Sequence, residues 1–141
     1  MSRPLHMAPR PCSTCPYRRD TPSGLWDASE YRKLALYDER PGETPETALF
    51  LCHQTSATGV ETACRGWATV HADTVAVRLA QARGSLTPAQ VRAEVDVDLY
   101  ATGQEACDAG LADIEDPGDA AMAAQVRLLR SKAGRLDNET P

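Results

Sequence analysis

The chain contains five cysteines, and four of them share a spacing that could bind a metal. Cys12 and Cys15 form a C-x-x-C pair, followed by Cys52 and Cys64 after 36 and 11 intervening residues. A C-x-x-C turn can direct two thiolates at one ion, which then requires two further ligands. Cys52 ends a predicted strand, and Cys64 opens a predicted helix whose N-terminal N–H groups favour a thiolate. The spacing therefore predicts one tetrahedral site formed by four cysteines.

Two histidines are alternative ligands. His53 directly follows Cys52, and neighbouring residues of an extended chain point to opposite sides, so both cannot easily serve one ion. His71 lies seven residues after Cys64, which is about 10 Å along a helix, whereas two ligands of one zinc lie about 3.5–4 Å apart. Four cysteines therefore rank first, three cysteines with His53 second, and sets with His71 third. The remaining Cys107 is interpreted as a small, partly buried side chain.

Four thiolates suit both a zinc ion and an iron–sulfur cluster. Proline follows Cys15 as it follows the last cysteine of bacterial ferredoxins, but ferredoxins place three cysteines close together, which this chain does not. We therefore favour Zn²⁺, with a [4Fe–4S] cluster as the alternative. Zinc held by four thiolates carries a charge of about −2, which arginines would offset. Arg18 and Arg65, with Trp67 packed against the site, are predicted to surround the ligands.

Other cysteine chemistry fits the sequence less well. A thioredoxin-type dithiol lies between a strand and a helix, whereas this pair follows "MAPRP" and precedes proline. A cysteine nucleophile needs a base, and Cys52 beside His53 is the one suggestive pair, although adjacent residues rarely meet in that way. Glycine-rich phosphate loops and nucleophile-elbow motifs are absent from the sequence.

Composition and charge narrow the classes of protein. The formal net charge is −5, which argues against a protein that coats nucleic acid without sequence preference. A basic segment over residues 1–19 could still contact phosphate. No apolar run approaches the roughly 20 residues of a membrane span, and the N-terminus lacks the apolar centre of a secretory signal. We therefore expect a cytoplasmic protein with a protein or nucleic-acid partner, without a membrane or small-molecule substrate.

Capping residues and apolar periodicity predict a mostly α chain with minor, irregular β structure. Asp27 with Glu30, and Thr102 with Glu105, resemble capping boxes, and Thr87 with Pro88 resembles an N-cap and first-turn proline. The predicted helices span residues 27–37, 63–83, 87–95, 102–110 and 116–133, and the predicted strands span 47–52 and 95–100. We expect a small single domain over residues 11–133, organised around a four-cysteine metal site, with a disordered N-terminus (1–10) and a flexible tail (134–141).

Three separated motifs carry a family resemblance: Pro-Cys-x-x-Cys-Pro-Tyr-Arg at residues 11–18, Cys-His at 52–53, and Cys-x-Gly-Trp at 64–67, followed by His71. The chain resembles an uncharacterised family of small proteins from actinobacteria and their phages, over about residues 10–120. The resemblance implies one shared domain and supplies no activity. The predicted function is a non-enzymatic interaction or regulatory module held by a structural zinc site, since a closed tetrahedral site has no position for substrate. The alternative is an iron–sulfur redox or sensor protein.

Overall fold

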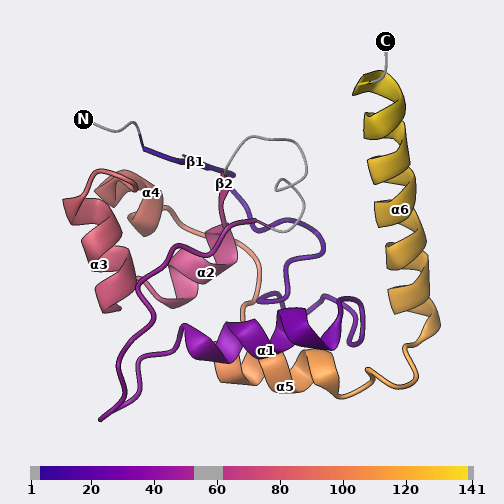
Figure 1. Ribbon diagram of the computed structural model, residues 1–141, viewed down its shortest axis with the longest axis horizontal. Helices are drawn as coiled ribbons and strands as arrows, with labels where there is room; N and C mark the ends of the chain where they lie inside the picture. The colour runs from indigo at the N-terminus through magenta and orange to yellow at the C-terminus, as the bar shows by residue number, and fades with distance from the viewer. Residues whose placement is uncertain (1–3, 53–61, 140–141) are drawn as a thin grey trace.

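The computed structural model describes residues 4–52 and 62–139, with side chains described up to Arg130. The chain is mostly helical, with very short strands, as the sequence predicts (Figure 1). Within the described ranges, no helix combines the length and hydrophobicity needed to cross a bilayer.

Helices α1 (Ala28–Leu36) and α5 (Gly103–Leu111) pack along each other. Both begin where their caps predict, because the Asp27 carboxylate accepts the N–H of Ser29 and the Thr102 hydroxyl accepts that of Glu105. Gly103 and Gly110 let the two helices approach closely, because a Cβ at Gly103 would lie 2.0 Å from the carbonyl oxygen of Leu34.

The predicted long helix over residues 63–83 is wrong, because the chain forms two shorter helices there. Helix α2 (Arg65–Val70) ends at His71, and α3 (Val75–Ala82) begins after Thr74. The Thr74 hydroxyl donates to the carbonyl oxygen of His71 at 2.7 Å and accepts the N–H of Val77 at 3.4 Å. This side chain therefore caps the second helix and bonds to the end of the first. The apolar periodicity of the sequence continues across this break, which is why it predicted a single helix.

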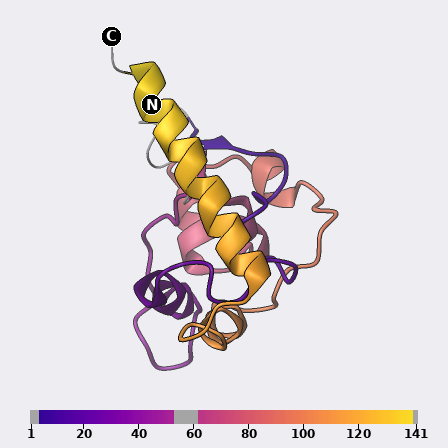
Figure 2. The same cartoon turned by 90° about the vertical axis from the view of Figure 1, so that its right-hand side faces the viewer.

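The sequence predicted the start of α4 (Pro88–Arg92) better than it predicted the ends of α6 (Asp119–Glu139). Helix α4 has the predicted Thr87 cap, completed by Gln90 as a capping box, but it ends before residue 95. Helix α6 starts after the predicted residue 116 and continues through Gly134. Figures 1 and 2 show that its C-terminal end extends beyond the rest of the chain.

The β structure is smaller than predicted and involves a segment that the sequence did not indicate. Strand β1 (His6–Met7) pairs in parallel with β2 (Thr62–Ala63). The predicted strand over 47–52 forms only an antiparallel bridge from Leu51 to Ala63, and that over 95–100 forms only a bridge from Leu99 to Arg18. Residues 62–63 therefore lie between two partners distant in sequence.

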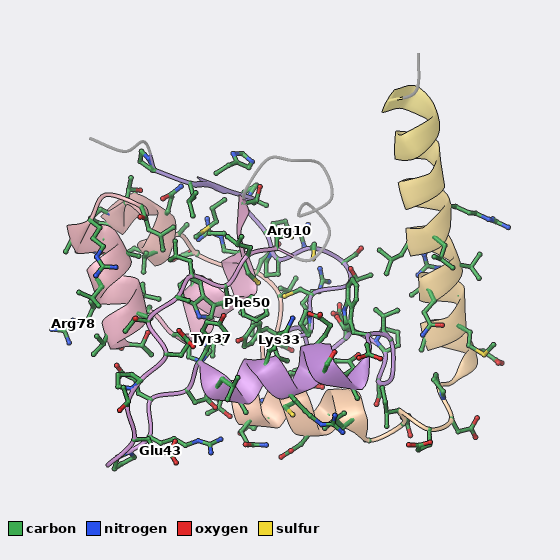
Figure 3. The ribbon with its side chains drawn as sticks, viewed as in Figure 1. Arg10, Lys33, Tyr37, Glu43, Phe50 and Arg78 are labelled. Atoms are coloured by element: carbon green, nitrogen blue, oxygen red, sulfur yellow. The ribbon has the colours of Figure 1, made fainter. Side chains whose placement is uncertain are left out.

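The core is aromatic at its centre. Trp67 and Tyr17 are fully buried. Tyr37 and Phe50 lie side by side (Figure 3), with ring centroids 5.0 Å apart and nearly perpendicular planes, and Phe50 also packs edge-on against Tyr17 at 5.9 Å. The segment after Cys15 and the segment before Cys52 thus meet in one cluster, which holds the cysteine-bearing loops together.

Candidate metal centre

The first cysteine pair lies in a tight, hydrogen-bonded loop. The N–H of Cys15 donates to the carbonyl oxygen of Cys12 at 3.0 Å, and the N–H of Arg18 donates to that of Cys15 at 3.0 Å. The Thr21 hydroxyl bonds the same Cys15 carbonyl at 2.7 Å, and the Trp26 indole N–H donates to the carbonyl oxygen of Thr14 at 2.8 Å. These contacts fix the backbone of the C-x-x-C turn, so both sulfurs have defined positions.

The other two cysteines are brought together by backbone pairing. The N–H of Cys52 donates to the carbonyl oxygen of Thr62 at 2.7 Å, and the N–H of Cys64 donates to that of Phe50 at 2.9 Å. Cys64 is also the N-cap of α2, where its sulfur accepts the N–H of Trp67 at 3.5 Å. The predicted position of Cys64 at a helix N-terminus is therefore confirmed.

All four cysteines line one cavity of about 160 Å³. The Cys15 and Cys64 sulfurs are 4.0 Å apart, and the Cys12 thiol interacts with the thiols of both Cys15 and Cys52. The thiols thus form a continuous chain of neighbours from Cys52 to Cys64. Within residues 4–52 and 62–139, however, no group of three or more His, Cys, Asp or Glu side chains has a geometry that could hold a metal ion as it lies.

Gly66 allows Cys15 to approach helix α2. A Cβ at this position would lie 2.7 Å from the Cys15 sulfur and 3.0 Å from the Cβ of Tyr17. Ordinary van der Waals contact begins at 3.4 Å, so no larger residue fits without moving the sulfur. The glycine of the Cys-x-Gly-Trp motif thus has a steric role beside the cysteine cluster.

The thiols of Cys12 and Cys15 favour their neutral form when no cation is present. The hydrogen bond with Cys15 and burial raise the pKa of Cys12 to about 11. Cys12 lowers the pKa of Cys15, but Cys64 and burial outweigh it, so the pKa of Cys15 lies well above its usual value. Ionising one thiol places a charge beside other sulfurs in a poorly solvated cavity. A bound cation would reverse this effect, because thiolates are the metal-binding form.

The three residues predicted to surround the ligands lie close to them in different ways. The Arg18 guanidinium donates to the carbonyl oxygen of Pro11 at 3.2 Å and pairs with Asp20 at 2.7 Å. Its pKa is raised chiefly by Asp20, with Cys15 and Cys12 adding to the effect. Arg65 lines the cysteine cavity, whereas the contact of Trp67 is made by its backbone N–H.

Arg65 is a buried cation bound by backbone oxygens. Its guanidinium donates to the carbonyl oxygen of Ala8 at 2.9 Å and also to that of Gln90. Burial lowers its pKa, whereas the adjacent Cys64 acts in the opposite direction. Arg65 therefore ties the N-terminal segment and α4 to the edge of the cysteine cavity.

The structure does not bring His71 to the cysteines. Its Nδ1 lies 3.1 Å from the carbonyl oxygen of Trp67 and its Nε2 lies 2.7 Å from Oδ1 of Asp38. Both ring nitrogens therefore have protein partners, and His71 lines a separate cavity. His53 lies outside the described residues. Cys107 is buried in α5, away from the other four cysteines, and burial raises its pKa.

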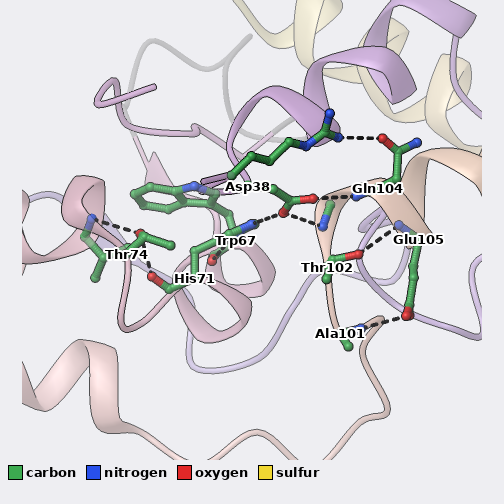
Figure 4. Close-up of polar contacts among 11 residues, drawn as sticks. Asp38, Trp67, His71, Thr74, Ala101, Thr102, Gln104 and Glu105 are labelled. Carbon is green, nitrogen blue, oxygen red and sulfur yellow. Dashed lines mark hydrogen bonds and ion pairs between the residues drawn. The ribbon is translucent and has the colours of Figure 1, made fainter. Parts of the chain in front are cut away.

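The sequence analysis missed Asp38, which joins three elements (Figure 4). Besides His71, its carboxylate accepts the N–H of Gly103 at 2.8 Å and that of Gln104 at 2.9 Å. It thus binds the free N–H groups at the start of α5, where a negative charge is favourable. His6, also missed, lines the cysteine cavity from β1. No local signal marks either residue, because each acts across a long sequence separation.

Comparison with known families gives one match. The model of DUF6283, a family of unknown function, matches residues 7–130. The chain belongs to DUF6283. The match covers the C-x-x-C loop, Cys52, Cys64 and the first part of α6, so the cysteine cluster of this DUF6283 member lies wholly inside the family domain. None of the curated proteins and none of the solved structures matches the chain significantly.

Proposed function

We propose that this DUF6283 member binds one zinc ion through the thiolates of Cys12, Cys15, Cys52 and Cys64. The observation that carries the proposal is the convergence of these four residues on one cavity from three separate segments. Zinc–sulfur bonds of about 2.3 Å in a tetrahedron place neighbouring sulfurs about 3.8 Å apart. The separation of 4.0 Å between the Cys15 and Cys64 sulfurs is close to that value. The Cys12 and Cys52 sulfurs would have to move to complete the coordination, since no three ligands in the described residues have a metal-holding geometry as they lie.

Charge supports the same proposal. Four thiolates around a divalent ion carry a net charge of about −2, which has to be offset in a buried site. Arg65 is buried beside Cys64 with backbone oxygens as its partners in the described part of the chain. Arg18, from the C-x-x-C loop, also lies near Cys12 and Cys15, but Asp20 already pairs with it. Arg65 is therefore the cation that best suits a negatively charged metal centre.

The metal would have a structural role. In the described part of the chain, the three segments that carry the four cysteines are linked by strand-like hydrogen bonds and by the aromatic cluster, and the ion would add a direct link between them. The binding free energy of structural zinc, roughly 10 kcal/mol or more, is comparable with the whole stability of a typical domain. Four protein ligands leave no open position for substrate, so we propose a non-enzymatic interaction or regulatory module.

A protein partner suits this module better than nucleic acid. Three arginines of the basic N-terminal segment are described, and each lies near a carboxylate: Arg10 with Asp96 at 3.0 Å, Arg18 with Asp20 at 2.7 Å, and Arg19 with Glu105 at 3.7 Å. Arg19 also stacks on Tyr100. Phosphate binding depends on cations free to neutralise the backbone, and these cations already have acidic neighbours.

A [4Fe–4S] cluster is the second candidate, and the size of the cavity favours it. A volume of about 160 Å³ is several times the roughly 30 Å³ that one water molecule occupies in the liquid, and is more than a single ion requires. In such a cluster each thiolate binds a different iron, so its sulfurs would lie farther apart than Cys15 and Cys64 do here. We therefore place zinc first.

Metal content tests the proposal. The full chain is purified without oxygen, and zinc, iron and sulfide are measured per chain. We expect one zinc, no iron and a colourless protein; a brown protein with a broad visible band would establish the cluster instead. Cys52→Ser should lose most of the metal, whereas the matched control Cys107→Ser should retain it. Full metal content in Cys52→Ser would remove that residue from the ligand set.

A further inference from the structure

Helix α6 exposes a narrow apolar stripe. Met122, Val126 and Leu129 are 55%, 45% and 67% exposed. They are three of the five large hydrophobic residues that are exposed in the described part of the chain. Their spacing of four and then three residues places them along one side of the helix. Grouped exposure of this kind marks an interaction surface more often than scattered exposure does.

The stripe is separate from the face that holds α6 to its own domain. Ala121 and Ala124 are buried, and the Gln125 amide donates to the carbonyl oxygens of Gly24 and Leu25 at 3.3 and 3.1 Å. At about 100° per residue, this buried face and the apolar stripe lie roughly a third of a turn apart. A second helix could therefore cover the stripe without displacing the domain.

The spacing of the stripe is that of a coiled-coil seam. In the sequence, Ala133 and Leu136 continue the series, giving intervals of four, three, four and three residues along the single helix that ends at Glu139. With Met122, Leu129 and Leu136 at d positions, Val126 and Ala133 occupy a positions. A β-branched residue at a with leucine at d favours a parallel, two-stranded coiled coil.

Charge is compatible with two identical helices in parallel. In this heptad assignment Lys132 occupies a g position and Asp137 the following e position. In a parallel pair, the g residue of one helix faces the next e residue of its partner, so the sequence offers two opposite-charge pairs related by symmetry. A membrane-binding helix has a broad apolar face, whereas a stripe confined to a and d positions is the narrower pattern of a seam.

We propose that the protein associates with a second copy of itself through α6, as a parallel two-stranded coiled coil. The described stripe and its continuation cover about two heptads, which is short, so the dimer is expected to be weak and to dissociate on dilution. In this arrangement the two domains lie on either side of the coil, each held by the buried face of its own helix. The inference goes beyond metal binding and does not depend on it.

Sedimentation equilibrium of the metal-loaded full chain tests the association. We expect the mean mass to rise toward twice the 15.2 kDa of the chain as the concentration increases from micromolar to millimolar. Leu129→Glu should remain monomeric throughout. Leu36→Glu is the matched control, since Leu36 is 64% exposed on α1 and its substitution should leave the dimer unchanged. A wild-type chain that stays monomeric, or a dimer weakened as much by Leu36→Glu, would overturn the proposal.

Two further readouts complete the test. Circular dichroism and the metal content of Leu129→Glu should match those of the wild type, so a misfolded variant cannot be mistaken for a dissociated one. Pyrene labels attached at the C-termini should give excimer emission in a parallel pair, because the two ends then lie together. Absence of the excimer would contradict the parallel arrangement, because antiparallel helices of 21 residues place their ends about 30 Å apart, too far for the rings to touch. Binding of the monomer to anionic lipid vesicles, lost in Leu129→Glu, would replace the proposed partner by a membrane.

Discussion

Replacement of Gly66 by alanine separates two opposite physical expectations. Gly66 lies in helix α2, where alanine is favoured over glycine by about 0.5–1 kcal/mol. Local propensity alone therefore predicts a more stable protein. The tertiary structure predicts the reverse, because the added Cβ would lie 2.7 Å from the sulfur of Cys15 and 3.0 Å from the Cβ of Tyr17.

The size of the effect follows from the overlap. To restore ordinary contact at 3.4 Å, the Cys15 sulfur has to move by about 0.7 Å from its present distance, whereas metal–ligand distances tolerate only about 0.2 Å. Overpacking of this kind costs about 1–3 kcal/mol, which exceeds the gain in helix propensity. We expect Gly66→Ala to lower the free energy of unfolding of the metal-loaded chain and to weaken zinc binding at least about tenfold, or 1.4 kcal/mol.

The assay combines urea denaturation with competition for zinc against a chelator of known affinity. Gly118→Ala is the control, because a Cβ at Gly118 meets nothing within 4 Å and the substitution should leave zinc affinity unchanged. Removing the sulfur by Cys15→Ala should reduce the stability penalty of Gly66→Ala, since one of the two contacts disappears. A Gly66→Ala chain that is more stable and binds zinc normally would refute the steric reasoning.

Two further substitutions test the contacts that join the helices. Asp38→Asn keeps the shape of the side chain but places an amide where the carboxylate accepts the N–H groups of Gly103 and Gln104. We expect the free energy of unfolding to fall by about 1.5–3 kcal/mol and the metal content to stay unchanged. Asp116→Asn, at an exposed position, is the control. Gly110→Ala should cost about 1–3 kcal/mol by overpacking α5 against α1, because a Cβ there would lie 2.1 Å from the ring of Tyr31. An unfolding midpoint in urea equal to that of the wild type would contradict either prediction.

The sequence by itself determined the features that depend on neighbouring residues. The starts of α1, α4 and α5 were predictable because Asp27, Thr87 and Thr102 bond to N–H groups two or three residues ahead. The position of Cys64 at a helix N-terminus was predictable for the same reason. The cysteine spacing also grouped four side chains that the folded chain brings to one cavity.

Only the tertiary structure decided the features that depend on contacts between distant residues. The predicted helix is interrupted at His71–Thr74, where His71 contacts Asp38, 33 positions earlier in the sequence. The apolar periodicity continues through this interruption, so the sequence alone does not reveal it. The predicted strand at 47–52 was reduced to a bridge, because its partner strand β2 is only two residues long. Gly66 belongs to the Cys-x-Gly-Trp motif of the sequence, but its steric role follows only from the approach of the Cys15 sulfur. Helix caps act within one turn, whereas close packing and strand pairing require a chain that has already folded back on itself.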